Sequence, residues 1–112
     1  MVKKDYELIV TIVNKGWAST VVESAQAAGA KGATVFRGRG SGLKTSLFGI
    51  PVEPEKDIIF CAVPKAISEH VLLTISQSAA LLKQGKGIAF TLPIGSIVGV
   101  FEGSSNDGKE KE

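Results

Sequence analysis

Apolar and polar positions in the first third of the chain follow a strand pattern, then a helical pattern, then a strand pattern again. Residues 6–13 are rich in β-branched side chains on both faces and stop at Asn14, which is typical of a buried strand. From Ala18 apolar residues recur every three or four positions, and Gly29 predicts the end of a short amphipathic helix. Residues 32–37 predict a second strand. The pattern therefore indicates a βαβ unit.

The second half of the chain repeats this order. Residues 57–63 are apolar on both faces and predict a third strand. Pro64 is placed to start a second helix, whose apolar stripe we expect to end near Gly85. Residues 88–92 predict a fourth strand, which Pro93 stops. Each half thus consists of a strand, an amphipathic helix and another strand.

Three further segments differ from this pattern. Residues 38–56 contain two prolines and no convincing period, so they predict a long connection that is functional or mobile. Residues 96–101 predict a last short strand or edge segment. We expect one domain over residues 1–103 and a disordered tail over residues 104–112, where no apolar side chain occurs.

The element order predicts an α+β protein with a ferredoxin-like βαββαβ sandwich, an antiparallel sheet carrying two helices on one face. Two helices cover only one face of four strands, yet the strands are apolar on both faces. Because an uncovered apolar face must be buried, the sequence predicts a homo-oligomer that packs its sheets together.

Composition restricts the function more than it identifies it. Of 112 residues, 44% are hydrophobic and 21% charged, as in an ordinary globular domain. The net charge of +2 is too small and too evenly spread for a nucleic-acid surface, so any anion site must be local. The beginning of the chain lacks the apolar region of a signal peptide, and no apolar run is long enough to span a membrane. We expect a cytoplasmic protein without direct membrane insertion.

Two glycine-rich basic turns carry the candidate chemistry. In the first, residues 37–42, glycines at alternate positions allow positive φ and can bring successive N–H groups into a concavity beside Arg37, Arg39 and Lys44. Most such sequences are only turns, so the motif is weak by itself. The second turn follows the second helix and contains Lys86. Our hypothesis is an inter-subunit site where both turns hold a polyphosphate by charge-assisted hydrogen bonds.

The chain resembles the PII signal-transduction proteins, regulators of nitrogen metabolism, over about residues 6–101. The resemblance rests on the element order, the long loop and four short segments: Ala33-Thr34-Val35, Arg39-Gly40-Ser41-Gly42, Gly85-Lys86-Gly87 and Phe90-Thr91-Leu92-Pro93. It implies a non-enzymatic homotrimer that binds ADP or ATP in clefts between subunits. It also implies that a mobile T-loop, here about residues 41–56, docks on a membrane transporter or metabolic enzyme.

The resemblance also implies the site residues. Those expected to contact nucleotide are Thr34, Arg39, Gly40, Ser41, Gly42, Gly85, Lys86 and Gly87. Those expected to contact the protein partner are Lys44, Leu47, Phe48 and Ile50. The chain also departs from the family. Ile88 stands where the family has the B-loop lysine, and the C-loop arginines fall near Gly99 and Phe101. The loop is shorter than in classical members, has no tyrosine to uridylylate, and lacks the glutamine linked to 2-oxoglutarate at its base. The chain resembles a divergent, PII-like member.

Two alternatives start from the fold alone. A ferredoxin-like fold also suits a small phosphate-ester or acyl-phosphate hydrolase. Against this reading, Cys61 is expected to be a buried hydrophobe and His70 stands alone on a helix, so no nucleophile and base pair is evident. The other alternative is a metal-associated trimer, but no cluster of ligands has recognisable spacing. We therefore predict neither catalytic residues nor metal ligands.

Overall fold

The computed structural model describes residues 2–39, 45–47, 50–52 and 55–99. Its elements in chain order are β1 (Val2–Lys3), β2 (Tyr6–Asn14), α1 (Ala18–Ala27), β3 (Thr34–Arg39), β4 (Thr45–Leu47), β5 (Ile50–Val52), β6 (Glu55–Pro64), α2 (Lys65–Ser78), β7 (Gly87–Ile94) and β8 (Ile97–Val98). The expected tail at 104–112 lies outside the described residues.

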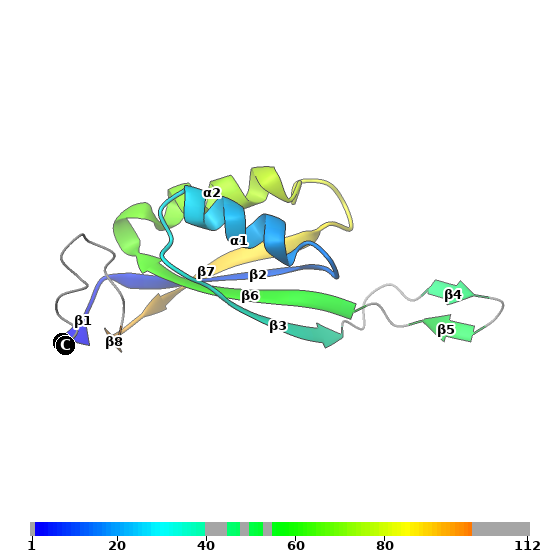
Figure 1. Cartoon of the computed structure of the whole chain (residues 1–112), viewed down its shortest axis with the longest axis horizontal. Helices are drawn as coiled ribbons and strands as arrows, with labels where there is room; N and C mark the ends of the chain where they lie inside the picture. Colours follow the sequence, from blue (N-terminus) through cyan, green and yellow to red (C-terminus); the bar gives the residue numbers. More distant parts are fainter. Residues whose placement is uncertain (1, 40–44, 48–49, 53–54, 100–112) are drawn as a thin grey trace.

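The central sheet has the order β3-β6-β2-β7, and every neighbouring pair is antiparallel. Both helices lie on one face of this sheet (Figure 1). This arrangement confirms the predicted ferredoxin-like α+β fold. It also makes β3 and β7 the two edges of the sheet, so the segments that follow β3 and precede β7 belong to opposite edges.

The core lies between the helices and every second residue of the two central strands. Ile9 and Thr11 of β2 lie beside Cys61 and Ile59 of β6 in register, and all four are buried. The helices add further buried aliphatic side chains, namely Val21, Ala25, Val71, Ile75 and Ala79. Burying one valine or isoleucine side chain contributes about 1.5–3 kcal/mol, which is why these alternating apolar positions fix the strand register.

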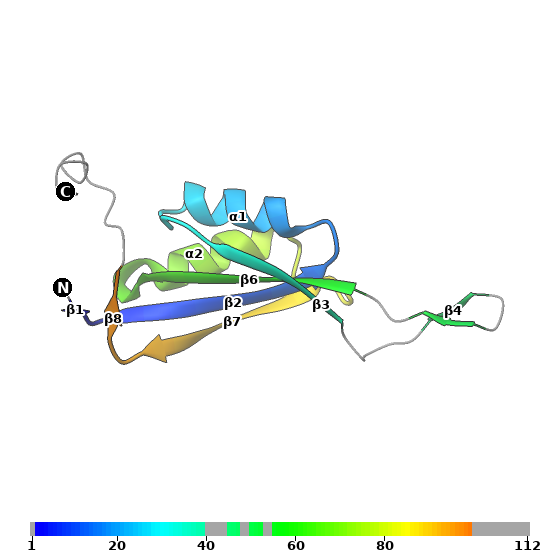
Figure 2. The same cartoon turned by 60° about the horizontal axis from the view of Figure 1, so that its bottom comes forward.

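The other face of the sheet is also apolar, as the sequence predicts. Phe36 and Phe60 meet edge to face with ring centroids 4.8 Å apart. On β7 the side chains of Phe90 and Leu92 are 38% and 47% exposed. In the part of the chain that the structure describes, both helices lie on the opposite side of the sheet (Figure 2). These exposed side chains therefore form an open apolar face.

The second helix ends earlier than predicted. It stops at Ser78 rather than near Gly85, because Ala80 adopts a left-handed φ of 55°. Two hydrogen bonds close the end, from Ala80 N to Gln77 O and from Leu81 N to Ser76 O. This is the bond pattern of a Schellman motif, in which glycine is the usual left-handed residue. Because alanine occupies this position, the apolar pattern of the helix continues past its end, and the sequence does not indicate where the helix stops.

The predicted long connection at 38–56 is partly wrong. The ladder between β3 and β6 extends to the pair Arg39 and Glu55, so both strands reach into this segment. Gly38 is a strand residue without positive φ, and a side chain there would approach Ile58 Cδ1 to 3.0 Å. Beyond this stem, β4 and β5 form a small antiparallel hairpin (Figure 1).

The two shortest strands lie at the other end of the sheet. Val2 of β1 pairs with Val98 of β8, and Lys3 pairs with Ile97. The last strand falls within the predicted segment 96–101, whereas β1 was not predicted, because two residues are too short for a strand pattern. Figure 2 shows this pair far from the β4–β5 hairpin.

Candidate site at the hairpin end of the sheet

One end of the sheet brings both glycine-rich segments to the same level of the molecule. Arg37 of β3, Asp57 of β6, Val13 of β2 and Gly87 of β7 stand opposite one another across the four strands. The hairpin stem leaves from this end, and the turn between α2 and β7 enters it (Figure 1). We call these residues, together with residues 14–18, 39, 55–56 and 85–86, the hairpin end.

Asp57 is the centre of the hairpin end. Its side chain is only 2% exposed, and its Oδ2 accepts hydrogen bonds from the backbone N–H groups of Gly16 at 3.0 Å and Ala18 at 3.3 Å. Arg37 Nε lies 2.8 Å from Oδ1. Oδ1 accepts no directed hydrogen bond from the described residues, so this contact is an ion pair. A buried carboxylate needs such partners, because an unpaired buried charge is strongly destabilising.

Further basic side chains surround this buried pair. Glu55 Oε1 lies 3.3 Å from Lys15 Nζ and 3.8 Å from Arg37 Nη1, both at partly exposed positions. Such surface pairs contribute little to stability. Basic residues nevertheless predominate over carboxylates at the described part of this end: Lys15, Arg37, Arg39, Lys56 and Lys86 against Glu55 and Asp57. The local potential therefore favours an anion.

Asn14 ties the end of β2 to the glycine turn. Lys56 Nζ donates a hydrogen bond to Asn14 Oδ1 at 2.8 Å. Asn14 Nδ2 in turn donates to Gly85 O at 3.2 Å. One amide side chain thus connects the stem strand β6 with the turn that precedes β7.

The conformation of this turn requires glycine. Gly85 has φ +82° and Gly87 has φ +143°. A Cβ on Gly87 would lie 2.4 Å from Ile12 O, so no other residue fits there without moving the backbone of β2. Between the glycines, Lys86 Nζ lies 5.7 Å from the centroid of the Trp17 ring, within cation–π range.

Comparison with known proteins decides the family. The family model described as "Nitrogen regulatory protein P-II" matches residues 6–103. The chain belongs to this family. Among solved structures, Arabidopsis thaliana PII bound to citrate is similar with a TM-score of 0.66 and 25% identity, over 91% of this chain and 89% of that chain. No curated protein matches the sequence. The suspected resemblance is confirmed, and the chain is a PII-like signalling protein.

The structure separates the predicted nucleotide residues of this P-II family member within one subunit. Arg39 ends one edge strand, whereas Gly85 and Lys86 precede the other and Gly87 begins it, three strand spacings or about 14 Å away across the sheet. Thr34 is exposed at the opposite end of β3. Gly40, Ser41, Gly42, Lys44 and Phe48 lie outside the described residues. Leu47 and Ile50 pair across the β4–β5 hairpin.

Sequence reasoning missed two residues of the hairpin end. The sequence pattern identifies Asp57 only as the start of a strand, because its pairing with Arg37 depends on a register between segments far apart in the chain. One signal for a buried carboxylate is present in the sequence. Asp57 lies on the same face of its strand as Ile59 and Cys61, which are core residues. Asn14 was read as a strand terminator, although its side chain makes two hydrogen bonds.

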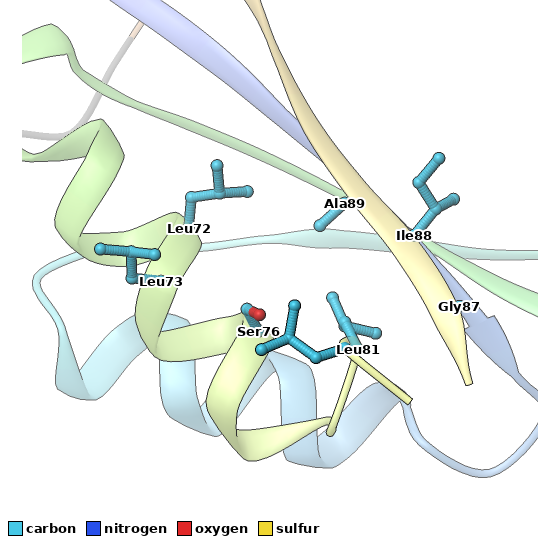
Figure 3. A pocket seen from close by; sticks show the side chains of 8 residues that line it. Leu72, Leu73, Ser76, Leu81, Gly87, Ile88 and Ala89 are labelled. Carbon is cyan, nitrogen blue, oxygen red and sulfur yellow. The ribbon is translucent and has the colours of Figure 1, made fainter. Parts of the chain in front are cut away.

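Two hollows lie along α2 and β7, and Gly87 of the hairpin end lines the first of them. The first, of about 260 Å³, is lined mainly by aliphatic side chains, among them Leu72, Leu81 and Ile88 (Figure 3). Without a basic side chain, it is unsuited to a phosphate. The second, of about 460 Å³, is lined by Glu7 and Ser68 among others, and Ser68 Oγ donates to Glu7 Oε1 at 2.7 Å.

The chemistry that could suggest an enzyme is poorly placed. Burial raises the pKa of the Cys61 thiol, and its Sγ donates to Gly32 O at 3.2 Å, so a reactive thiolate is disfavoured. His70 is exposed on α2. Within the described residues, no group of three or more His, Cys, Asp or Glu side chains could hold a metal ion. No helix in the same part of the chain is long and apolar enough to cross a membrane.

Proposed function

We propose that the protein is a homotrimeric sensor that binds an adenine nucleotide, ADP or ATP, in clefts between subunits. Its ligand state is reported through the segment between β3 and β6 to a protein partner, a membrane transporter or a metabolic enzyme. The observation that carries this proposal is the hairpin end, where basic side chains and a conformationally constrained glycine turn adjoin the base of that segment. Family membership supports the signalling role.

The open face of the sheet supports the trimer. Phe36, Phe60, Phe90 and Leu92 are large apolar side chains on the face that neither helix covers. Monomeric proteins seldom leave such a contiguous apolar surface in water. Packing this face against two further copies would bury it and place unlike parts of neighbouring chains side by side.

The separation of the predicted residues supports a cleft between subunits rather than a site within one. Arg39 and the turn at residues 85–87 lie on opposite edges of one sheet. Thr34 is a strand length away from Arg39. A nucleotide spans more than a single phosphate group, but it cannot use all of these residues unless a second chain supplies some of them.

Phosphate binding would combine the two kinds of donor found here. Backbone N–H groups of the glycine turn and the ammonium of Lys86 would face one phosphate group, while Arg39 supplies a second cation from a neighbouring edge. Charge-assisted hydrogen bonds of this kind are stronger than neutral ones. Nucleotide would bias the partner-binding segment only to the extent that it binds one conformation of that segment more tightly.

Isothermal titration calorimetry tests the proposal. We expect ADP or ATP to bind with one site per subunit, and Lys86→Gln to weaken that binding at least tenfold. The matched control is Lys31→Gln, which removes an exposed lysine before β3, away from the hairpin end, and should leave affinity unchanged. Absence of heat with ADP, ATP, AMP and cyclic dinucleotides, on a protein shown to be folded and trimeric, would refute nucleotide sensing.

A further inference from the structure

The turn between β2 and α1, residues 14–18, touches both halves of the hairpin end (Figure 1). On the stem side, Asp57 accepts hydrogen bonds from Gly16 and Ala18, the two neighbours of Trp17. On the side of the glycine turn, Asn14 donates to Gly85 O. This short segment is therefore the physical connection between the stem and the glycine turn within one subunit.

The two sides of this connection differ in stiffness. Asp57 is buried and held by two backbone donors and Arg37, so its side chain has little freedom to move. Any movement away from these partners would leave a buried charge unpaired, which is strongly destabilising. Lys86 is held more weakly, because its ammonium lies over the Trp17 ring at 5.7 Å, close to the outer limit of a cation–π contact. The weak contact is the one that a ligand can displace.

We infer that Trp17 and Asp57 are positioning residues for the anion site, and that they transmit its occupancy to the hairpin stem. This inference rests on the proposed binding of a phosphate at Lys86. A phosphate offers the ammonium a charge-assisted hydrogen bond, which is stronger than its contact with the indole ring, so Lys86 leaves Trp17. The released turn shifts, and Asp57 passes the shift to Arg37 on β3.

Linkage makes the effect reciprocal. If occupancy at Lys86 alters the stem, then fixing the stem alters the affinity at Lys86 by the same factor. A protein partner that binds the β4–β5 hairpin would therefore change nucleotide affinity without contacting the nucleotide. The coupling is carried by a contiguous set of contacts, from Lys86 through Trp17 and the turn to Asp57 and Arg37.

The fluorescence of Trp17 tests the first step, because it is the only tryptophan in the chain. Titration of the full-length protein with ADP should shift its emission with the same midpoint as calorimetry. Lys86→Gln should change the Trp17 emission of the ligand-free protein. Adding ADP to this variant should then leave the emission unchanged, even at ADP concentrations high enough to saturate the weakened site. Lys86→Arg, which keeps a cation over the ring, should retain the response.

Hydrogen exchange tests the second step. In the wild-type protein ADP should slow exchange of the amides at residues 37–39. Asp57→Asn keeps an oxygen for the backbone donors but removes the charge that holds Arg37; it should retain the Trp17 response and lose the protection at 37–39. Glu23→Gln, at an exposed position on α1, is the matched control and should behave as wild type. Arg37→Gln removes the same ion pair from its 53% exposed side and replaces Asp57→Asn should that variant fail to fold.

The outcomes separate this inference from the proposed function. If calorimetry detects no binding of ADP, ATP, AMP or cyclic dinucleotides to the folded, trimeric wild-type protein, the proposed function fails and the inference with it. If ADP binds but the emission of Trp17 does not move, the displacement of Lys86 is refuted while nucleotide binding stands. If Asp57→Asn and Arg37→Gln both keep the protection at residues 37–39, the transmission through Asp57 is refuted.

Discussion

Replacing Gly87 with alanine is expected to be among the most damaging single-methyl additions to this protein. The residue has φ +143°, a backbone region that side chains rarely adopt, and such strain costs about 1–3 kcal/mol. The added Cβ would also meet Ile12 O at 2.4 Å, and that oxygen belongs to the backbone of the neighbouring strand. Relief would require part of the β2–β7 ladder to separate. We therefore expect a loss of at least about 3 kcal/mol in the free energy of unfolding.

Two other glycines provide matched controls for this prediction. Gly85 has φ +82° but open space around its Cβ position, so Gly85→Ala should cost about 1 kcal/mol from backbone strain alone. Gly32 has neither positive φ nor a close neighbour, and Gly32→Ala should fall within about 0.5 kcal/mol of wild type. The three variants thus separate two contributions to the loss of stability: the steric clash of the added Cβ and the backbone strain of a positive φ.

Urea unfolding at one fixed protein concentration measures all three changes, since the stability of an oligomer depends on concentration. The slope m should be unchanged, and the midpoints should fall in the order Gly32→Ala, Gly85→Ala, Gly87→Ala. If Gly87→Ala lost no more stability than Gly85→Ala, the close approach between β7 and β2 would not be the reason for glycine at this position. The reasoning would then be refuted even if both variants were unstable.

Three further predictions concern assembly, ionisation and helix termination. Phe90→Asp places a charge on the open face and should dissociate the proposed trimer in sedimentation velocity. Leu82→Asp, at a 95% exposed position after α2, should leave the oligomeric state unchanged, and a trimeric Phe90→Asp would count against this interface. Burial raises the pKa of Cys61 above its ordinary value of 9.0, so the unfolded chain loses this proton first and stability should fall as pH rises above about 9. Between pH 7 and pH 10, the urea midpoint should fall less for Cys61→Val than for the wild-type protein. An equal fall in the two proteins would show that ionisation of Cys61 is not the cause. Ala80→Gly relieves a left-handed φ of 55° and should stabilise the protein by about 0.5 kcal/mol, measured as a rise in Tm; a fall in Tm would refute the strain.

The fold was predictable because its determinants are local. Residues 6–13 and 57–63 are unbroken runs of strand-forming side chains bounded by turn residues, and the structure places them in the two central strands β2 and β6. Central strands are covered on one face by helices and remain apolar on the other, which is why their sequence pattern was so clear. The resulting element order left few arrangements for the chain.

What the sequence could not predict depended on contacts between distant segments. Asp57 meets Arg37 only because β3 and β6 pair in one register, which no local pattern records. The β4–β5 hairpin was concealed by short strands and by Pro51, a residue tolerated on the edge of a two-stranded sheet. The end of α2 was concealed because Ala80 takes a conformation that glycine normally signals.

The same feature of the fold accounts for both the proposed trimer and the proposed cleft. The strand order puts the stem of the hairpin on one edge of the sheet and the glycine turn on the other, and it leaves the face between them apolar. A two-fold dimer through that face would pair one patch with its own copy, so that each contact occurs twice. A cyclic trimer instead uses two different patches of each chain, so the β3 edge of one copy can approach the β7 edge of the next. We expect this arrangement to join Arg39 to the turn at residues 85–87, so nucleotide affinity should be lost whenever the trimer is lost.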